Sequence, residues 1–217
     1  MTTFCDTKYP TESEYNKIFE QYSFPLSDFQ KYAIQTIIEG QHILVTAHTG
    51  SGKTLPAEFA IKHFIAQGKK IIYTSPIKAL SNQKFYEFSK QFPDITFGLL
   101  TGDIKFNPEA QVLIMTTEIL RNTLFQKKVI QKEEEKHKDI LSFEMDIEIE
   151  LGCVIFDEIH YINDADRGRV WEETIMMLPN HIQMVMLSAT LDKPENFAGW
   201  IERNKGKKVI ISSTSHR

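Results

Sequence analysis

Ala47-His48-Thr49-Gly50-Ser51-Gly52-Lys53-Thr54 is the stretch of sequence that decides the fold of this chain. It directly follows an apolar run at residues 42–46 and precedes a helical pattern. Glycines at positions 50 and 52 let backbone N–H groups approach phosphates, Lys53 can reach the β- and γ-phosphates, and Thr54 offers an oxygen to Mg²⁺. The stretch therefore predicts a phosphate-binding loop, although Ala47 replaces the first glycine of the full G-x-x-x-x-G-K-[ST] motif.

A second motif, Val154-Ile155-Phe156-Asp157-Glu158-Ile159-His160, places an acidic pair at the end of another apolar run. Carboxylates at the end of a buried strand lie at the edge of a parallel sheet where ligands bind. In an enzyme with a phosphate-binding loop, we expect Asp157 to hold Mg²⁺ through water and Glu158 to deprotonate the attacking water. A lone histidine such as His160 is more often a structural hydrogen-bonding group than a catalytic one.

Strand and helix patterns alternate along the chain from residue 27 onward. Apolar runs predict strands at residues 42–46, 70–75, 95–100, 111–116, 151–157, 182–188 and 208–213. Helical patterns lie between them, at residues 27–39, 53–67, 77–91, 117–126, 170–178 and 193–203. The runs are apolar at successive positions, as in strands that are buried on both faces. This order predicts a three-layer α/β fold with a mainly parallel sheet.

Composition excludes several classes of protein. The chain has 217 residues, of which 41% are hydrophobic and 25% charged, so it is neither disordered nor a coiled coil throughout. It has no apolar stretch of the ~20 residues that a membrane span needs, and its N-terminus lacks the pattern of a signal peptide. We expect an intracellular, soluble protein without a membrane partner, in a compartment that the sequence leaves open between cytoplasm and nucleus. The net charge of −4 argues against coating of nucleic acid by bulk charge, but allows a local basic groove.

Residues 127–150 (KKVIQKEEEKHKDILSFEMDIEIE) break the alternation. The segment carries 5 basic and 8 acidic side chains. Its first half is typical of a solvated helix, and its second half alternates apolar and acidic residues as a strand does. A charged insertion on the surface is the interpretation that such a charge run favours.

Three further runs carry a resemblance to a known family: residues 74–84 (TSPIKALSNQK), 116–122 (TTEILRN) and 166–173 (DRGRVWEE). With the two motifs above, the chain resembles the first RecA-like domain of a superfamily-two DExH-box helicase. Within that superfamily it is most similar to the Ski-type, exosome-associated RNA helicases. The resemblance implies a P-loop NTPase that binds ATP and Mg²⁺, with Thr54 and Asp157 at the metal. It also implies a catalytic set of Lys53, Asp157, Glu158 and His160.

The resemblance further assigns contacts to the nucleotide and to a nucleic-acid strand. Phe24 is expected to stack on the adenine base and Gln30 to read its edge, beside phosphate contacts from Thr49, Gly50, Ser51, Gly52, Lys53 and Thr54. Ser188 and Thr190 are expected to couple hydrolysis to nucleic-acid binding. The sugar-phosphate backbone of a nucleic-acid strand is expected to contact Pro76, Lys78, Ala79, Gly102, Asp103, Thr116, Thr117 and Arg121. Taken singly, these residues are explained as well by capping or surface roles; Thr116 or Thr117, for example, could cap the next helix.

The domain layout follows from the same resemblance. We expect residues 1–23 to be a lead-in and residues 24–217 to form the ATP-binding domain, with the insertion at about 127–150. Only 27 residues follow Thr190, whereas a second RecA-like domain needs ~150. We therefore expect that domain to be absent from these 217 residues, and the fragment to be a monomer that hydrolyses ATP very weakly or not at all.

Four functions are compatible with a phosphate-binding loop. The first is an ATP-dependent RNA helicase motor domain that binds single-stranded RNA. The second is a DNA helicase or translocase, because backbone contacts do not distinguish the two sugars. The third is a nucleotide-binding scaffold without activity, which has no need of Lys53, Thr54, Asp157 and Glu158 together. The fourth is a small-molecule kinase, which leaves Gln30 and the run Ser188-Ala189-Thr190 unexplained.

Overall fold

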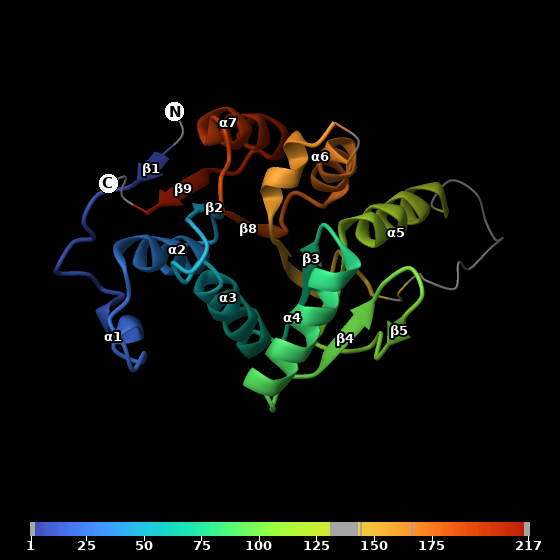
Figure 1. Ribbon diagram of the computed structural model, residues 1–217, viewed down its shortest axis with the longest axis horizontal. Coiled ribbons are helices and arrows are strands. Elements are labelled where there is room, and N and C mark those ends of the chain that lie inside the picture. Colours follow the sequence, from blue (N-terminus) through green and yellow to red (C-terminus); the bar gives the residue numbers. More distant parts are fainter. Residues whose placement is uncertain (1–2, 131–142, 144, 166, 215–217) are drawn as a thin grey trace.

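A single sheet of nine strands forms the centre of the protein in the computed structural model, which describes residues 3–130, 143, 145–165 and 167–214 (Figure 1). The strands are β1 (Thr3–Cys5), β2 (His42–Thr46), β3 (Lys70–Ser75), β4 (Phe97–Leu100), β5 (Lys105–Phe106), β6 (Val112–Thr116), β7 (Leu151–Phe156), β8 (Gln183–Ser188) and β9 (Val209–Ser213). They lie in the order β1-β9-β2-β8-β7-β3-β6-β4-β5, and every neighbouring pair is parallel except β4 and β5. The predicted α/β fold with a mainly parallel sheet is confirmed.

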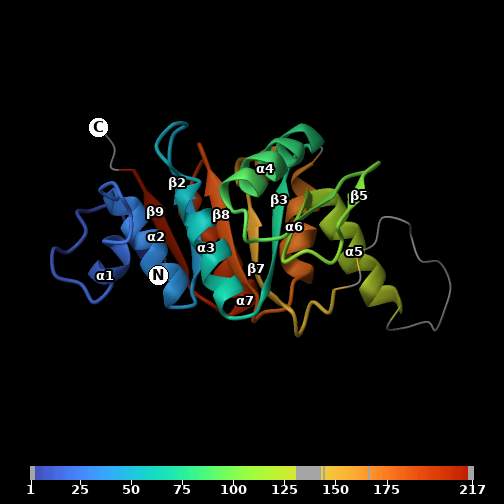
Figure 2. The same ribbon diagram turned by 90° about the horizontal axis from the view of Figure 1, so that it is seen from below.

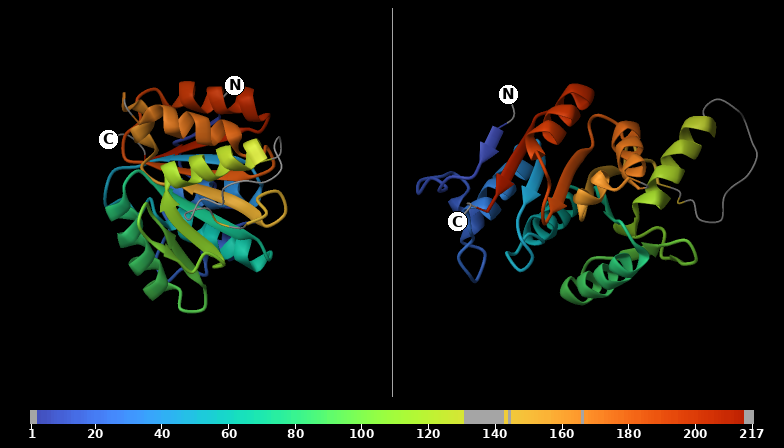
Figure 3. Two further views of the ribbon diagram at one scale, coloured as in Figure 1. Left: turned by 90° about the vertical axis from the view of Figure 1, so that its right-hand side faces the viewer. Right: turned by 45° about the horizontal axis from the view of Figure 1, so that its top comes forward.

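Helices cover both faces of the sheet, so the protein has three layers (Figure 3). The helices are α1 (Asn16–Phe19), α2 (Asp28–Ile38), α3 (Leu55–Ala66), α4 (Lys78–Gln91), α5 (Thr117–Ile130), α6 (Gly168–Met177) and α7 (Pro194–Lys205), with a 3-10 helix η1 (Ile159–Asn163). One core joins the sheet to α2, α3 and α4, and the other joins it to α5, α6 and α7. No helix in the described ranges is both long and apolar enough to cross a membrane.

The central strands are buried on both faces because successive side chains point into different cores. In β3, Ile71 and Tyr73 belong to the core on the α3 and α4 side, whereas Ile72 belongs to the core on the α5 and α6 side. This is the burial that apolar residues at successive positions predict. It fixes the register of each strand, since a slip by one residue would exchange the two faces.

The predicted elements are present, with ends that differ from the predicted ones by at most four residues. Four short elements were not predicted: β1, β5, α1 and η1. Each has two to five residues, which is too short for a hydrophobic period to show. Tertiary contacts hold them instead, as β5 illustrates: it pairs antiparallel with β4 through Leu99 and Leu100.

Residues of the expected lead-in pack on the domain. Strand β1 pairs in parallel with β9 at one edge of the sheet. Tyr9 and Phe19 are buried in a small cluster with Leu26, Ile34 and Leu55. Leu55 is the first residue of α3, so this cluster supports the helix that follows the phosphate-binding loop. The division at residue 23 stays a prediction.

The segment 127–150 is described only in part. Helix α5 continues into it as far as Ile130, while residues 131–142 and 144 lie outside the described residues. Phe143, Met145 and Ile147 are buried in the core beside α5 and α6, and Ile149 is 68% exposed. Residues 147–150 form a turn, and residues 143 and 145–150 contain no strand. The strand-like alternation therefore forms no strand at these positions, and three of its apolar side chains are buried in the domain core instead. The charged insertion at about 127–150 stays a prediction.

Because β2, β3, β4, β6, β7 and β8 are parallel, the loops after them meet at one edge of the sheet. Figure 2 shows the loop after β2 and the helix after β3 on this same, upper edge. Every motif singled out in the sequence follows one of these strands, apart from the segment around Phe24 and Gln30. The fold thus brings the motifs together at the carboxyl edge.

Candidate nucleotide-binding and catalytic site

The loop between β2 and α3 has the backbone of a phosphate cradle. Gly50 and Gly52 adopt φ values of 85° and 83°, which lie in the left-handed region that favours glycine. The loop is closed by Ser51, whose N–H and hydroxyl both donate to the His48 carbonyl, at 3.2 and 2.6 Å. Thr54 precedes the first residue of α3, so the partial positive charge of the helix N-terminus adds to that of the loop.

Lys53 and Glu158 meet at this edge although 105 residues separate them in the sequence. The Lys53 Nζ donates to Glu158 Oε1 at 2.9 Å. Their side chains are 11% and 24% exposed, so the ion pair is largely shielded from water. The structure thus brings together the predicted phosphate-binding ammonium and the predicted general base. The two groups form an ion pair with each other.

Asp157 is buried at the end of β7, with a relative exposure of 6%. The Tyr73 hydroxyl donates to its Oδ2 at 2.5 Å, and the Glu158 N–H donates to its Oδ1 at 2.9 Å. Burial raises the pKa of Asp157 above its ordinary value, although the Tyr73 hydrogen bond acts in the opposite direction. Lys53 and Lys84 also favour the ionised form through their charges. Tyr73 was not predicted as a site residue, because a tyrosine within an apolar strand is typical of a core.

Glu158 has a strained backbone. Its backbone angles, φ 53° and ψ 45°, lie in the left-handed region, which residues other than glycine seldom adopt. The turn directs Glu158 Oε1 to Lys53 and brings Oε2 within 3.2 Å of His160 Nδ1. That approach lacks hydrogen-bond geometry, so His160 Nδ1 is buried without a partner among the described residues. His160 is therefore beside the predicted base but does not hold it in place.

Gln30 connects the expected adenine-binding segment to the phosphate loop. Its Oε1 accepts from the Ser27 N–H at 2.9 Å, which fixes the start of α2. Its Nε2 donates to the Gly52 carbonyl at 3.1 Å. The amide oxygen keeps one further acceptor position, and the amide nitrogen keeps one further donor hydrogen. Phe24 is 50% exposed, and its ring lies 5.9 Å from that of Tyr22, so its outer face is open to a base.

The residues present fit ATP with Mg²⁺. The glycine cradle and Lys53 suit the phosphates, whereas the Asp157 carboxylate and the Thr54 hydroxyl are the oxygen ligands that Mg²⁺ prefers. Within the described residues, no group of three or more His, Cys, Asp or Glu side chains could hold a metal without a ligand's oxygens. A metal that enters with nucleotide phosphates needs no such group.

The predicted nucleic-acid residues lie at the ends of β3, β4 and β6, which are neighbours in the sheet. The ammonium of Lys78 forms an ion pair with Asp103, so the loops after β3 and β4 are joined. The hydroxyl of Thr117, the first residue of α5, donates at 3.4 Å to the carbonyl of Ser75, the last residue of β3. Pro76 and Thr116 are half-buried, while Ala79 and Gly102 are exposed.

Arg121 on α5 is engaged by a carboxylate. Its Nε and Nη2 both lie 2.7 Å from Glu173 Oε2, on α6. Arg169 donates to the other oxygen of Glu173 at 2.8 Å. The pKa of Glu173 is below its usual range because both arginines hydrogen-bond to it. Sequence reasoning missed this role of Glu173, since nothing in its spacing links it to Arg121.

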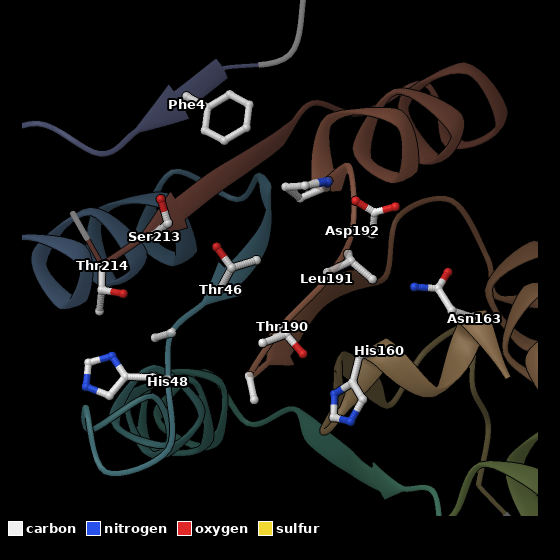
Figure 4. A pocket seen from close by; sticks show the side chains of 13 residues that line it. Phe4, Thr46, His48, His160, Asn163, Thr190, Leu191, Asp192, Ser213 and Thr214 are labelled. Atoms are coloured by element: carbon white, nitrogen blue, oxygen red, sulfur yellow. The ribbon is translucent and has the colours of Figure 1, made fainter. Parts of the chain in front are cut away.

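Ser188 is the last residue of β8 and Thr190 follows it, and β8 lies between the strands that carry the phosphate loop and the acidic pair. The Ser188 hydroxyl donates to the Thr190 carbonyl at 3.0 Å and closes this turn. A cavity of 1010 Å³ opens beside it, and its lining includes His48 of the loop after β2, Thr190 and His160 of η1 (Figure 4). The predicted coupling residues therefore lie next to both motifs of the nucleotide site.

Comparison with known proteins gives a consistent result. Residues 27–197 match the family described as DEAD/DEAH box helicase. The chain is 47% identical over 194 residues to antiviral helicase SKI2 of Saccharomyces cerevisiae, which covers 89% of this chain and 14% of the relative. It is 44% identical over 192 residues to exosome RNA helicase MTR4 of Homo sapiens, which covers 88% of this chain and 17% of the relative. The chain thus spans less than a fifth of the length of these relatives.

A solved structure of helicase Lhr of Mycobacterium smegmatis, bound to single-stranded DNA and AMP-PNP, has the same fold. It superposes with a TM-score of 0.68 at 25% identity and covers 93% of this chain and 27% of that one.

Proposed function

Because the chain belongs to the DEAD/DEAH box helicase family, we propose that it is the ATP-binding motor domain of an RNA helicase. The predicted resemblance to DExH-box RNA helicases of the Ski type is confirmed by the two relatives at 47% and 44% identity. The activity proposed is that of the longer polypeptide in which such a domain works, since the relatives are several times the length of this chain.

The contact between Lys53 and Glu158 is the observation that carries the proposal. It joins the phosphate loop after β2 to the acidic pair after β7 across the intervening β8. An ammonium that can bind the terminal phosphates and a carboxylate that can take a proton from water are then within a few ångströms of one place. A scaffold that only bound nucleotide would need the first group and not the second.

Nucleotide binding changes the partners of this pair. Phosphate oxygens in the cradle of Gly50 and Gly52 would compete with Glu158 Oε1 for the Lys53 ammonium. The exchange leaves the Glu158 carboxylate free to orient a water and accept its proton as the water oxygen bonds to the γ-phosphorus. The bond from that phosphorus to the bridging oxygen of the β-phosphate breaks, and ADP is the leaving group. When bound, Mg²⁺ neutralises charge on the β- and γ-phosphates, and Asp157 and Thr54 are the residues that would hold it. Gln30 and Phe24 would hold adenine.

The loops after β3, β4 and β6 are proposed to bind a single strand through its backbone. Backbone N–H groups, hydroxyls and cations in such loops would contact phosphate without reading bases. Lys78 and Arg121 are already paired with Asp103 and Glu173, so a phosphate has to displace a carboxylate in each case. We therefore expect the 217-residue chain to bind RNA weakly.

Calorimetry with ADP and Mg²⁺ tests the nucleotide site. We expect the 217-residue chain to bind ADP and the Lys53→Ala variant to bind it at least about tenfold more weakly, because no neighbouring cation can replace the ammonium. Lys70→Ala is the matched control, since Lys70 pairs with Glu150 at the opposite edge of the sheet. Equal affinities for the Lys53→Ala variant and the unaltered chain would refute the phosphate-loop assignment.

Fluorescence anisotropy with single-stranded RNA, and DNA of the same sequence as competitor, tests the nucleic-acid side. Few cations are available, so we expect the affinity to fall with salt with a logarithmic slope of magnitude about 2 or less. Competition by RNA but not by DNA would show use of the 2′-hydroxyl and support an RNA motor. Equal competition would favour the DNA translocase instead, and a steep slope would show a further basic surface.

A further inference from the structure

Tyr73 is a buried tyrosine on the central strand β3, and no step proposed above uses its hydroxyl. Its relative exposure is 0%. Phe88 of α4 packs edge-on against its ring, with the two ring centroids 5.3 Å apart. The ring therefore has a fixed position in the core on the α3 and α4 side. A phenylalanine would fill the same space. The hydroxyl is therefore the part of Tyr73 that packing does not explain.

Strand register explains where the hydroxyl lies. Tyr73 pairs with Ile155 of β7, and its side chain points to the same face of the sheet as that of Ile155. Asp157 is two residues further along the same strand direction, so its side chain starts on that face as well. Two residues of strand span about 6.6 Å, a distance that the long tyrosine side chain covers. Its hydroxyl reaches Asp157 Oδ2 at 2.5 Å.

This contact defines how the Asp157 carboxylate is held. Tyr73 donates to Oδ2 and the Glu158 N–H donates to Oδ1. No other side chain of the described residues hydrogen-bonds to it, since Lys53 bonds to Glu158 and Lys84 to Glu87. Two donors on different oxygens fix the plane of a carboxylate, and each oxygen keeps a lone pair for water or metal.

We propose that the Tyr73 hydroxyl is a positioning group that orients the Asp157 carboxylate toward the Mg²⁺ of a bound nucleotide. The inference rests on the proposed function and deepens it. Tyr73 touches neither nucleotide nor metal but acts through Asp157, in the way that outer-shell partners orient metal ligands elsewhere. Without the hydroxyl, Oδ2 loses its only side-chain donor and the carboxylate is free to turn about its Cβ–Cγ bond.

The test is the Mg²⁺ dependence of ADP binding to the 217-residue chain and to its Tyr73→Phe variant. Without Mg²⁺, in EDTA, we expect the two to bind ADP equally. With Mg²⁺ added, the concentration that gives half of the increase in affinity should be about tenfold higher for Tyr73→Phe, as is typical when an outer-shell partner is lost. An identical Mg²⁺ dependence would overturn the inference.

Tyr9→Phe is the matched control, because it removes another buried hydroxyl, one that donates to Gln35 Oε1 at 2.7 Å away from the acidic pair. We expect its Mg²⁺ dependence to match that of the unaltered chain. An equal increase of the half-maximal Mg²⁺ concentration in both variants would mean that loss of any buried hydroxyl loosens the protein, and would overturn the inference. If the unaltered chain bound no ADP, the proposed function itself would fail. If it bound ADP and Tyr73→Phe behaved identically, only the inference would fail.

A second measurement covers the case in which Tyr73→Phe does not fold. With 3-fluorotyrosine at position 73, the fluorine resonance reports on the hydroxyl without removing it. We expect the resonance to move when Mg²⁺ is added to the ADP complex, and an unmoved resonance would overturn the inference.

Discussion

Glu158→Gln should make the 217-residue chain bind ADP more tightly. Before phosphates can bind the Lys53 ammonium, the ion pair of Lys53 with Glu158 has to break. Glutamine keeps the size of the side chain but removes its charge, so Lys53 is released more easily. The loss of a negative charge beside the phosphates acts in the same direction.

The size of the effect follows from the pair's geometry. Lys53 Nζ and Glu158 Oε1 are 2.9 Å apart and largely shielded, with 11% and 24% of their side chains exposed. A pair that is partly open to water contributes about 1 kcal/mol. Removing it should tighten ADP binding about fivefold.

Isothermal titration calorimetry of ADP measures this directly. Glu150→Gln is the matched control: Glu150 pairs with Lys70 at 3.1 Å, at the amino ends of β3 and β7, and the variant carries the same change in net charge. We expect unchanged affinity for the control. In a Lys53→Ala background, most of the gain from Glu158→Gln should disappear. Unchanged or weaker binding by Glu158→Gln would refute the reasoning.

Three further predictions concern stability and RNA binding. Burial lowers the pKa of His42 to about 3, whereas it is about 6.5 in the unfolded chain. The unfolded state therefore binds the proton more readily, and stability present above pH 6.5 should be lost as the pH falls toward 3, by up to about 1.4 kcal/mol per pH unit. His42→Asn, which keeps an acceptor, should flatten this dependence in urea titrations; an unchanged slope would contradict the prediction. Gly52→Ala should lower the melting temperature more than Gly40→Ala. Both glycines have positive φ, but only at Gly52 would a Cβ meet another atom, the Gln30 Nε2 at 2.6 Å. Equal decreases in melting temperature would show that the Gln30 amide moves aside freely. Glu173→Gln should release Arg121, strengthen RNA binding in anisotropy titrations and steepen the salt slope by about 0.7; a slope identical to that of the unaltered chain would mean that Arg121 binds no phosphate.

The fold, and the placement of the candidate site residues at one edge of the sheet, could be predicted because both depend on local patterns that the sheet then assembles. Apolar runs mark the strands, and parallel strands carry their following loops to one edge. This rule alone predicts that Lys53 and Glu158 lie close together. Short elements escaped prediction because contacts elsewhere in the fold hold them, as β1 shows by pairing with β9 at the other end of the chain.

The contacts that a side chain makes were harder to predict than the strand or loop in which its residue lies. Tyr73 lies within an apolar strand and has the pattern of a core residue, and only the register of β3 with β7 reveals its contact with Asp157. Met145 and Ile147 follow a charge run, so their burial depends on the room between α5 and α6, which no local pattern contains.

One principle links the candidate binding residues. Lys53 lies in the loop after β2, Lys78 is the first residue of α4 and Arg121 belongs to α5, and in each case a carboxylate forms an ion pair with the cation. An incoming phosphate must replace that carboxylate, so the net gain is the difference between two ion pairs rather than the full strength of one. The displaced carboxylate also stays close by and needs a new partner. Affinity for an isolated phosphate should therefore be low, and useful affinity should require a ligand that contacts several of these sites at once, as a nucleotide or a continuous strand does.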